Sequence, residues 1–587
     1  MKRAVGLTMT IVCVGGLLPG CTFGGHGDDL AESASCSAEA SATPIPKYNY
    51  RIDNKVSAPV KPVPDAKRGG TVRVYDVVDY QHLDPARIYV NNLQTLSQLL
   101  TRQLTGYLED GTNIKLVGDL ATDTGKSSNG NRTWTYTLRP GITWEDGSPV
   151  TSADVKYGLE REFVEDYSEG PTYLQTWFAG TQDFHSVYKG PYDGKELDAI
   201  QTPDDKTVVL NFKEAQPDVP FAMALQGAPV KKSKDTRGDY DLKPFSNGPY
   251  KIASHNIDRN MVLVRNTAWK GASDPIRTDY PDRFEFTFGE TPLDTNRRLI
   301  AAVGADAAAM TVVDGVSPEV LDKVLNRPDL LARSVSGLTQ FTSYVVFNLR
   351  RMTDIRVRKA VMYAYPRCQL RQLVGGPDTG DFAGTLSSPT LVGHEDSDLF
   401  QVPPGGDPQR ARALLKEAGK LGTKLVMPYN ASSRRGQQAG IITTQALEKA
   451  GFKVIKKAVD PKDQDLESDP SNPFDVYAQG WAADWPSGST VYPPLFDGRL
   501  IVDGPGNTDQ SFFKDDAINK QMDAIRKIAD PIEAGKRWAA LDRAILQKLP
   551  VFPDTYLRSR QLYGPRLGHV TYDNIYGEVS LNGLYVK

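Results

Sequence analysis

Cysteine is scarce in this chain of 587 residues, with only Cys13, Cys21, Cys36 and Cys368 present. A small fold held together by many disulfide bonds is therefore excluded, and the stability of the protein has to come from a hydrophobic core. The four cysteines allow a disulfide bond between Cys36 and Cys368. It would tie an N-terminal tail to the body of the protein, and we leave it open.

An excess of positive charge is also missing. The chain has 69 Lys and Arg residues against 72 Asp and Glu, so its formal net charge is −3. Because no basic stripe is present, we expect no nucleic-acid partner. The six histidines are scattered without the spacing of metal ligands, which predicts no metal site.

Recognisable catalytic and cofactor motifs are absent as well. Gly125-Lys126-Ser127 looks like the end of a phosphate-binding loop, but Leu120 stands where the first glycine is needed. The sequence has neither a nucleophile elbow nor a zincin helix. We therefore expect a protein that is not an enzyme and needs no cofactor. An unrecognised carboxylate pair among the 72 acids leaves a surface hydrolase as a weaker alternative.

Long apolar runs are confined to the N-terminus. Lys2 and Arg3 precede an uncharged run from Ala4 to Leu18, which is shorter than the roughly 20 apolar residues of a membrane-spanning helix. The pattern predicts a cleavable secretory signal. Because Cys21 follows the small residue Gly20, residues 1–20 resemble a bacterial lipoprotein signal. The resemblance implies a lipid anchor on Cys21 at the extracytoplasmic face of the bacterial cell membrane. The alternative is an ordinary secretory signal with an incidental cysteine.

The segment 21–67 is rich in Gly, Ser, Ala, Asp and Pro. Such a composition buries too little apolar surface to offset its ordering entropy. We therefore expect a disordered tether there, which would hold the folded part away from the membrane.

The remainder alternates between strand and helix patterns. Residues 71–75, 133–138, 207–212 and 261–265 alternate like strands, and residues 90–106 have leucines at helical spacing. Ser152 is a plausible N-cap of a further helix. The order of strand 423–428, helix 437–450 and strand 453–455 predicts an α/β lobe with parallel strands. Proline at position 366 predicts that the helix starting at Asp354 ends or bends near Tyr365, and we expect its basic residues Arg356, Arg358 and Lys359 to face solvent.

Several motifs, taken in order, resemble the extracytoplasmic solute-binding proteins of peptide-type ABC importers, the oligopeptide- and dipeptide-binding family 5. The most specific is the stretch from Arg139 to Val155, RPGITWEDGSPVTSADV. Others are Gly69-Gly70-Thr71-Val72-Arg73, Asn247-Gly248-Pro249-Tyr250, the helix motif 407–419 and Gly480-Trp481-Ala482-Ala483-Asp484-Trp485. Together they cover about residues 69–587.

The resemblance implies an α/β, two-lobed, periplasmic-binding-protein-like clamshell with an additional inserted α+β domain. The implied boundaries are lobe I at 68–102, 229–337 and 549–587, the inserted domain at 103–228, and lobe II at 338–548. The ligand would be enclosed between the lobes by hinge closure.

The same resemblance implies a set of ligand-binding residues. Asp484 would hold the α-ammonium of a peptide, because a carboxylate in an enclosed cleft needs a cation. The residues expected along the peptide main chain, or forming the cleft wall, are Gly480, Trp481, Ala482 and Trp485 from one lobe and Tyr89, Val90 and Asn91 from the other. For each, the alternative is ordinary packing, and Asp484 could instead pair with a basic side chain or cap a helix.

The implied partners are an oligopeptide ligand and the permease subunits of an ABC importer, with the binding protein itself a monomer. Alternatives within the binding class are a glycoside, an opine or a metal complex as ligand, or a surface lipoprotein that senses peptides without uptake. Aromatic residues such as Trp481 and Trp485 would suit a sugar ring equally well.

Overall fold

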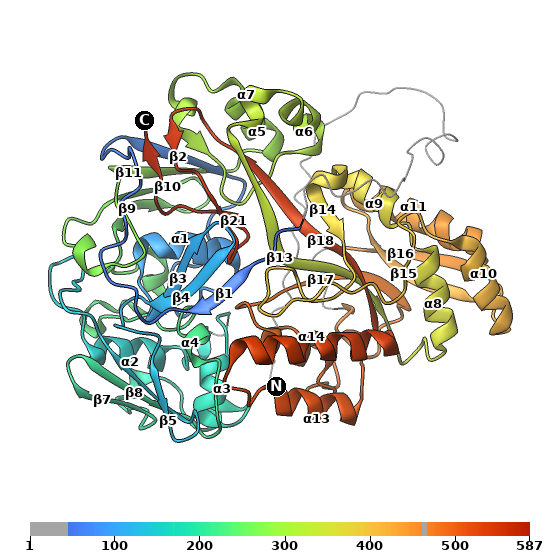
Figure 1. Ribbon diagram of the computed structural model, residues 1–587, viewed down its shortest axis with the longest axis horizontal. Helices are drawn as coiled ribbons and strands as arrows, with labels where there is room; N and C mark the ends of the chain where they lie inside the picture. The colour runs from blue at the N-terminus through green and yellow to red at the C-terminus, as the bar shows by residue number, and fades with distance from the viewer. Residues whose placement is uncertain (1–44, 168, 461–465) are drawn as a thin grey trace. The chain divides into compact units, whose positions relative to one another are not determined.

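The computed structural model describes residues 45–167, 169–460 and 466–587 (Figure 1). The chain divides into two compact units, which we treat separately. Unit 2 comprises Lys47–Gly337, Arg526–Ile532 and Ser559–Lys587, and the main body of unit 1 is Leu338–Ile525 with Glu533–Arg558. None of the helices in the described ranges has the length and apolar character needed to cross a membrane.

The core of unit 2 is a five-stranded sheet in the order β12-β2-β11-β10-β9. Its strands are β2 (Thr71–Asp76), β9 (Tyr250–Asn256), β10 (Asn260–Arg265), β11 (Arg283–Phe288) and β12 (Ala309–Met310). Helix α1 (Asn91–Leu100) presents Leu93, Leu96 and Leu99 to the core cluster that contains Val72 and Val74 of β2. The leucine spacing correctly predicted this helix, but it ends at Leu100, earlier than expected.

Two further sheets of unit 2 have the strand orders β1-β4-β3 and β5-β6-β8-β7. They contain β1 (Asn49–Ile52), β3 (Thr105–Asp110), β4 (Asn113–Gly118), β5 (Lys126–Ser128), β6 (Thr133–Thr137), β7 (Ile200–Asp204) and β8 (Thr207–Asn211). Strand β1 lies within the predicted tether 21–67, so the prediction of disorder is wrong for this part. Its backbone pairs in parallel with β4, with Tyr50 opposite Ile114. Backbone pairing at a sheet edge needs little apolar side-chain surface, so composition does not reveal it.

The helices of unit 2 that follow α1 are short. They are α2 (Ser152–Arg161), α3 (Tyr173–Ala179), α4 (Val219–Ala222), α5 (Pro292–Ala301), α6 (Pro318–Leu325) and α7 (Pro328–Leu331). The N-cap of α2 is Thr151 and not Ser152, because Thr151 and Asp154 form a reciprocal capping box. The Ser152 hydroxyl instead donates to the carbonyl oxygen of Asp204.

Unit 1 is built on the sheet β14-β18-β13-β17. Its strands are β13 (Ser334–Phe347), β14 (Gly380–Phe382), β17 (Val476–Ala482) and β18 (Val551–Leu562), and the chain passes between the units within β13 and within β18. Strands β15 (Lys424–Asn430) and β16 (Lys453–Val459) pair in parallel, with helix α11 (Arg434–Ala450) between them in sequence. The predicted strand–helix–strand unit is therefore confirmed.

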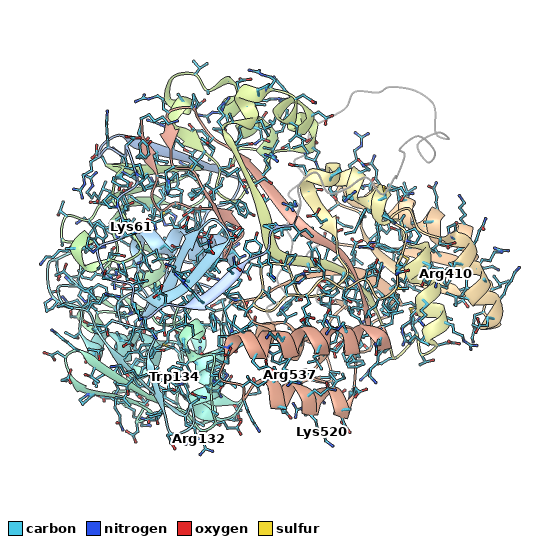
Figure 2. All side chains as sticks on the ribbon, in the orientation of Figure 1. Lys61, Arg132, Trp134, Arg410, Lys520 and Arg537 are labelled. Atoms are coloured by element: carbon cyan, nitrogen blue, oxygen red, sulfur yellow. The ribbon has the colours of Figure 1, made fainter. Side chains whose placement is uncertain are left out.

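The other helices of unit 1 are α8 (Ile355–Ala364), α9 (Arg367–Val374), α10 (Pro408–Glu417), α12 (Tyr492–Phe496), α13 (Asp516–Ile525) and α14 (Pro531–Lys548). Several are amphipathic: Arg410 on α10, Lys520 on α13 and Arg537 on α14 are exposed (Figure 2), and Leu415 and Ile518 on the first two helices are buried.

Helix α8 ends before Tyr365, as Pro366 predicted. Its basic face is only partly exposed, however, because the Arg358 side chain is buried. The Arg358 guanidinium donates to the carbonyl oxygens of Leu549 at 2.9 Å, Lys548 at 2.9 Å and Met352 at 2.6 Å. Two of these carbonyl groups, those of Lys548 and Leu549, come from a distant part of the chain, so the helical pattern alone could not place Arg358 inside.

Cys368 on α9 is buried and takes part in a disulfide bond. Cys13, Cys21 and Cys36 lie outside the described residues. The pairing of Cys36 with Cys368 and the lipid on Cys21 therefore stay predictions.

A buried group of four charges fixes the end of α1 within unit 2. Arg102 Nε lies 2.9 Å from Asp119 Oδ1 and 3.4 Å from Asp274 Oδ2, and Arg277 Nη2 lies 2.8 Å from Asp119 Oδ2. The Arg102, Asp119 and Asp274 side chains are 0 % exposed. Burial opposes ionisation of Asp274, but the guanidinium groups of Arg102 and Arg277 outweigh it and lower the pKa of this carboxyl.

We expect Asp119→Ala to lower the free energy of unfolding by about 3–5 kcal/mol, because it leaves two arginines without one of their buried counter-charges. Urea unfolding of the purified protein measures the effect. Arg297→Ala is the control, since it removes only an exposed ion pair with Asp294, worth about 0.2–1 kcal/mol. A loss below that of the control would contradict a structural role for the buried charges.

Candidate ligand-binding site

Strand β17 lies at the edge of its sheet and contains three of the predicted ligand-binding residues. It pairs with β13 in antiparallel register, with Gly480 opposite Ser343, Trp481 opposite Thr342 and Ala482 opposite Phe341. On its other side, β15 lies against the start of β17, where the N–H of Asp475 donates to the carbonyl oxygen of Val426 at 2.8 Å. In the described part of the chain, no strand pairs with the far end of β17 at Gly480–Ala482. An open edge presents a row of backbone N–H and C=O groups with which an extended peptide can pair.

The loop after β17 is held by its own side chains. Trp481 Nε1 donates to the carbonyl oxygen of Thr490 at 2.8 Å, and the backbone N–H of Asp484 donates to Thr490 Oγ1 at 3.2 Å. The Thr490 side chain is fully buried. These bonds place the half-buried Asp484 just beyond the end of the open strand.

Trp485 differs from its neighbours because its side chain is only 2 % exposed. Its Nε1 donates to Ser489 Oγ at 3.2 Å. This burial agrees with the alternative that Trp485 belongs to the core, and its contact with a ligand stays a prediction. Trp481 is half-buried and thus retains accessible ring surface.

The second predicted segment, Tyr89–Asn91, leads into helix α1 of unit 2. Val90 is the N-cap and has extended backbone angles, φ −79° and ψ 155°. Gln94 Nε2 donates to the carbonyl oxygen of Tyr89, and Asn91 Nδ2 donates to the carbonyl oxygen of Tyr576, both at 2.8 Å. All three predicted residues are half-buried. The structure therefore gathers the predicted residues into two sets, one in each unit.

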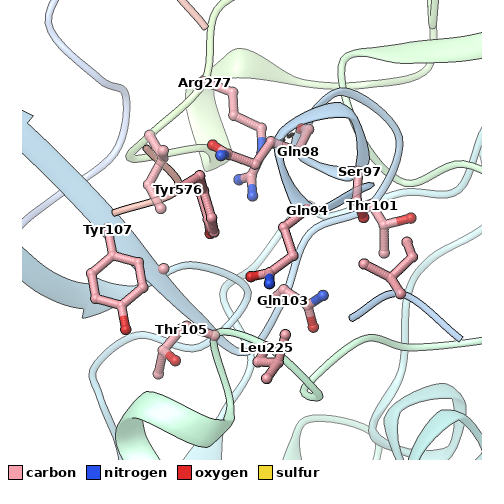
Figure 3. A pocket seen from close by; sticks show the side chains of 14 residues that line it. Gln94, Ser97, Gln98, Thr101, Gln103, Thr105, Tyr107, Leu225, Arg277 and Tyr576 are labelled. Carbon is pink, nitrogen blue, oxygen red and sulfur yellow. Dashed lines mark hydrogen bonds between the residues drawn. The ribbon is translucent and has the colours of Figure 1, made fainter. Parts of the chain in front are cut away.

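A small polar cavity of about 20 Å³ is lined by residues that include Ile88 and Gln94, which flank the Tyr89–Asn91 segment in sequence (Figure 3). Its polar lining comprises Gln94, Ser97, Gln98, Thr101, Gln103, Thr105, Tyr107, Arg277 and Tyr576. Among the described residues, Gln103 Oε1 and the Tyr107 hydroxyl have no hydrogen-bond partner. The cavity is large enough for about one water molecule, and its free groups can hydrogen-bond a water or a polar ligand group.

Sequence reasoning missed this cavity. Its walls come from α1, from β3 and from the distant positions 276–277 and 576, so no local spacing connects them. The only available signal was the number of Gln and Thr residues between positions 94 and 105, which is also common on ordinary surfaces.

No group of three His, Cys, Asp or Glu residues in the described ranges is arranged to hold a metal ion. The side chains around the β17 edge and the Tyr89–Asn91 segment offer hydrogen bonds, one carboxylate and aromatic surface. In each unit by itself, such groups are able to hydrogen-bond main-chain groups of a ligand.

The chain is similar in sequence to known proteins. Residues 115–500 match the family model described as bacterial extracellular solute-binding proteins, family 5 Middle. The periplasmic oligopeptide-binding protein OppA of Salmonella typhimurium is 24 % identical over 483 residues, which cover 78 % of this chain and 81 % of that protein. The periplasmic murein peptide-binding protein MppA of Escherichia coli is 24 % identical over 500 residues, covering 83 % and 87 %.

Among solved structures, clavulanic acid biosynthesis oligopeptide binding protein 2 superposes with a TM-score of 0.81 and 29 % sequence identity. The match covers 91 % of this chain and 98 % of that one. The predicted α/β fold of the periplasmic-binding-protein type is thereby confirmed.

Proposed function

Given that the chain belongs to family 5 of the bacterial extracellular solute-binding proteins, which bind solutes and are not enzymes, we propose that it captures oligopeptides and delivers them to an ABC import permease. The ligand would be enclosed between the two lobes that the family resemblance implies. The protein would act at the extracytoplasmic face of the bacterial cell membrane, anchored by lipid on Cys21.

The observation that carries this proposal is the open edge of β17. Peptides of different sequence share the same main chain, so a strand edge can bind them without reading their side chains. Gly480 has no side chain to hinder the approach of a second backbone, and Trp481 provides apolar surface beside it. The names of the relatives OppA and MppA agree with a peptide ligand.

Asp484 supplies the second element of the proposal. Its half-buried carboxylate follows the open strand and is held through the Thr490 contact to its backbone. The α-ammonium of a peptide would form charge-assisted hydrogen bonds with it and thereby fix the register of the peptide along β17.

We expect Asp484→Asn to weaken the binding of tripeptides with a free N-terminus by about 10- to 100-fold, because the ammonium group loses its counter-charge. Isothermal titration calorimetry with a mixed tripeptide pool measures the change. N-acetylated tripeptides are expected to bind both proteins equally weakly. Asp503→Asn, which changes an exposed aspartate of the same unit, is the matched control. Unchanged affinity in the Asp484 variant would rule out this role, and tight binding of oligosaccharides in place of peptides would overturn the proposed ligand.

The lipid anchor is tested separately. We expect the wild-type protein, expressed in a bacterium that lipidates its exported proteins, to partition into the detergent phase of a Triton X-114 extract. Cys21→Ser should move it to the aqueous phase, because the thiol that would carry the lipid is gone. Cys13→Ser is the control. Detergent-phase partitioning of the Cys21 variant would favour an ordinary signal with an incidental cysteine.

A further inference from the structure

A short buried turn, Ser487–Thr490, lies between the residues expected to bind the ligand and helix α12. Gly488–Thr490 form a 3₁₀ turn, and the side chain of Thr490 is 0 % exposed. Trp481 and Asp484 both hydrogen-bond to Thr490, and they do so through different atoms of it. Two expected ligand-binding residues are thus joined through a third residue that is itself too deeply buried to touch a ligand.

The carbonyl group of Thr490 orients the ring of Trp481. Trp481 Nε1 donates to this carbonyl oxygen at 2.8 Å. An indole ring has a single N–H donor, so the bond favours one orientation of the half-buried ring. The apolar surface that Trp481 adds beside β17 is therefore held in place by the backbone of the turn.

The hydroxyl group of Thr490 holds the backbone at Asp484. Thr490 Oγ1 accepts from the N–H of Asp484 at 3.2 Å, and it donates to the carbonyl oxygen of Ser487 at 3.1 Å. A hydroxyl can accept and donate at the same time, whereas the methyl group that replaces it in valine can do neither. The part of the backbone that carries the Asp484 carboxylate is therefore tied to one buried oxygen atom.

Two serine hydroxyls stiffen the turn from within. Ser487 Oγ accepts from the N–H of Ser489 at 3.3 Å and lies 3.0 Å from Ser489 Oγ. Ser489 Oγ also accepts from Trp485 Nε1 at 3.2 Å. These bonds give Thr490 a fixed support, and Thr490 is the residue of the turn that bonds to both Trp481 and Asp484.

The turn is also packed closely against helix α14 of the same unit. A Cβ atom at Gly488 would lie 2.5 Å from Trp538 Cγ and 2.8 Å from Tyr492 Cε2. The rings of Trp538 and Tyr492 are stacked on each other, with their centroids 5.6 Å apart. Because only glycine fits here without movement, the turn has little freedom to shift relative to α14.

A fixed position of Asp484 relative to β17 matters for an extended ligand. Hydrogen-bonding positions along a strand edge repeat every second residue, so the edge alone allows a peptide to slide by two residues. A carboxylate held just beyond the strand meets the α-ammonium of the peptide in one register. The position of Asp484, and not only its charge, therefore decides whether a free N-terminus is recognised.

We propose that Thr490 is a positioning residue of the ligand site. Its hydroxyl sets the Asp484 carboxylate and its carbonyl sets the Trp481 ring, so that both meet the amino end of a peptide paired with β17. The inference rests on the proposed peptide-binding function and deepens it: the site selects peptides by a free α-ammonium group in one register.

Calorimetry with two matched tripeptide pools tests this role. The pools have the same sequences, but one has free N-termini and the other is N-acetylated. We expect the wild-type protein to prefer the free pool by about 10- to 100-fold. Thr490→Val keeps the shape of the side chain and removes its hydroxyl, so it should lower this preference by about fivefold or more. Thr490→Ser keeps the hydroxyl and should stay within about twofold of the wild-type preference.

Thr444→Val is the matched control. It removes a threonine hydroxyl of the same unit, one that donates to the carbonyl oxygen of Gly440 within α11, and it should keep the full preference. If Thr490→Val does not fold, Gly488→Ala tests the same role, because the added methyl group has to displace the turn from Trp538. This variant should also lower the preference for the free pool by about fivefold or more.

Amide hydrogen exchange of the peptide-free protein provides an independent readout. In Thr490→Val the N–H of Asp484 loses its acceptor, so its exchange should become about tenfold faster than in the wild-type protein. In Thr490→Ser the exchange rate should stay close to that of the wild-type protein.

Three results would overturn the inference and leave peptide binding intact. The first is equal weakening of both pools in Thr490→Val, which would indicate a general structural role. The second is an unchanged preference in Thr490→Val, or a loss of the same size in Thr490→Ser. The third is equal binding of the two pools by the wild-type protein. Absence of binding of either pool to the wild-type protein would overturn the proposed function and, with it, this inference.

Discussion

Backbone groups at a strand edge need hydrogen-bond partners, and this requirement underlies the account of the ligand site. Strand β17 has β13 on one side and β15 against its start on the other, and in the ranges that the structure describes no strand pairs with its Gly480–Ala482 end. Native proteins normally cover or charge such an edge. Here it carries Gly480 and Trp481 and is followed by a loop tied to Thr490. The edge is therefore both open and held in place. A ligand that adds a further strand to the sheet can bind to it.

Rigidity in unit 2 has a different origin. The buried charges of Arg102, Asp119, Asp274 and Arg277 neutralise one another and hold the C-terminal end of α1. The other end of the same helix carries Asn91, which donates to the carbonyl oxygen of Tyr576.

Local patterns predicted the elements whose residues interact with near neighbours. The β15–α11–β16 unit, the α1 leucines and the end of α8 before Pro366 follow from spacing and proline chemistry. The motif resemblance, more than periodicity, supplied the fold and the β17 residues. Local patterns did not predict the features that depend on residues distant in sequence. Strand β1 is ordered because it pairs with β4, and Arg358 is buried because it donates to carbonyl groups near position 549.

The central claim is that the peptide main chain pairs with β17, and amide hydrogen exchange tests it most directly. The exchange rates of Gly480, Trp481 and Ala482 should be measured with and without saturating tripeptide. Pairing predicts that exchange at the outward-facing amides of this stretch slows by at least tenfold on binding, because these amides gain hydrogen-bond partners. Binding of the peptide with unchanged exchange along β17 would contradict the account.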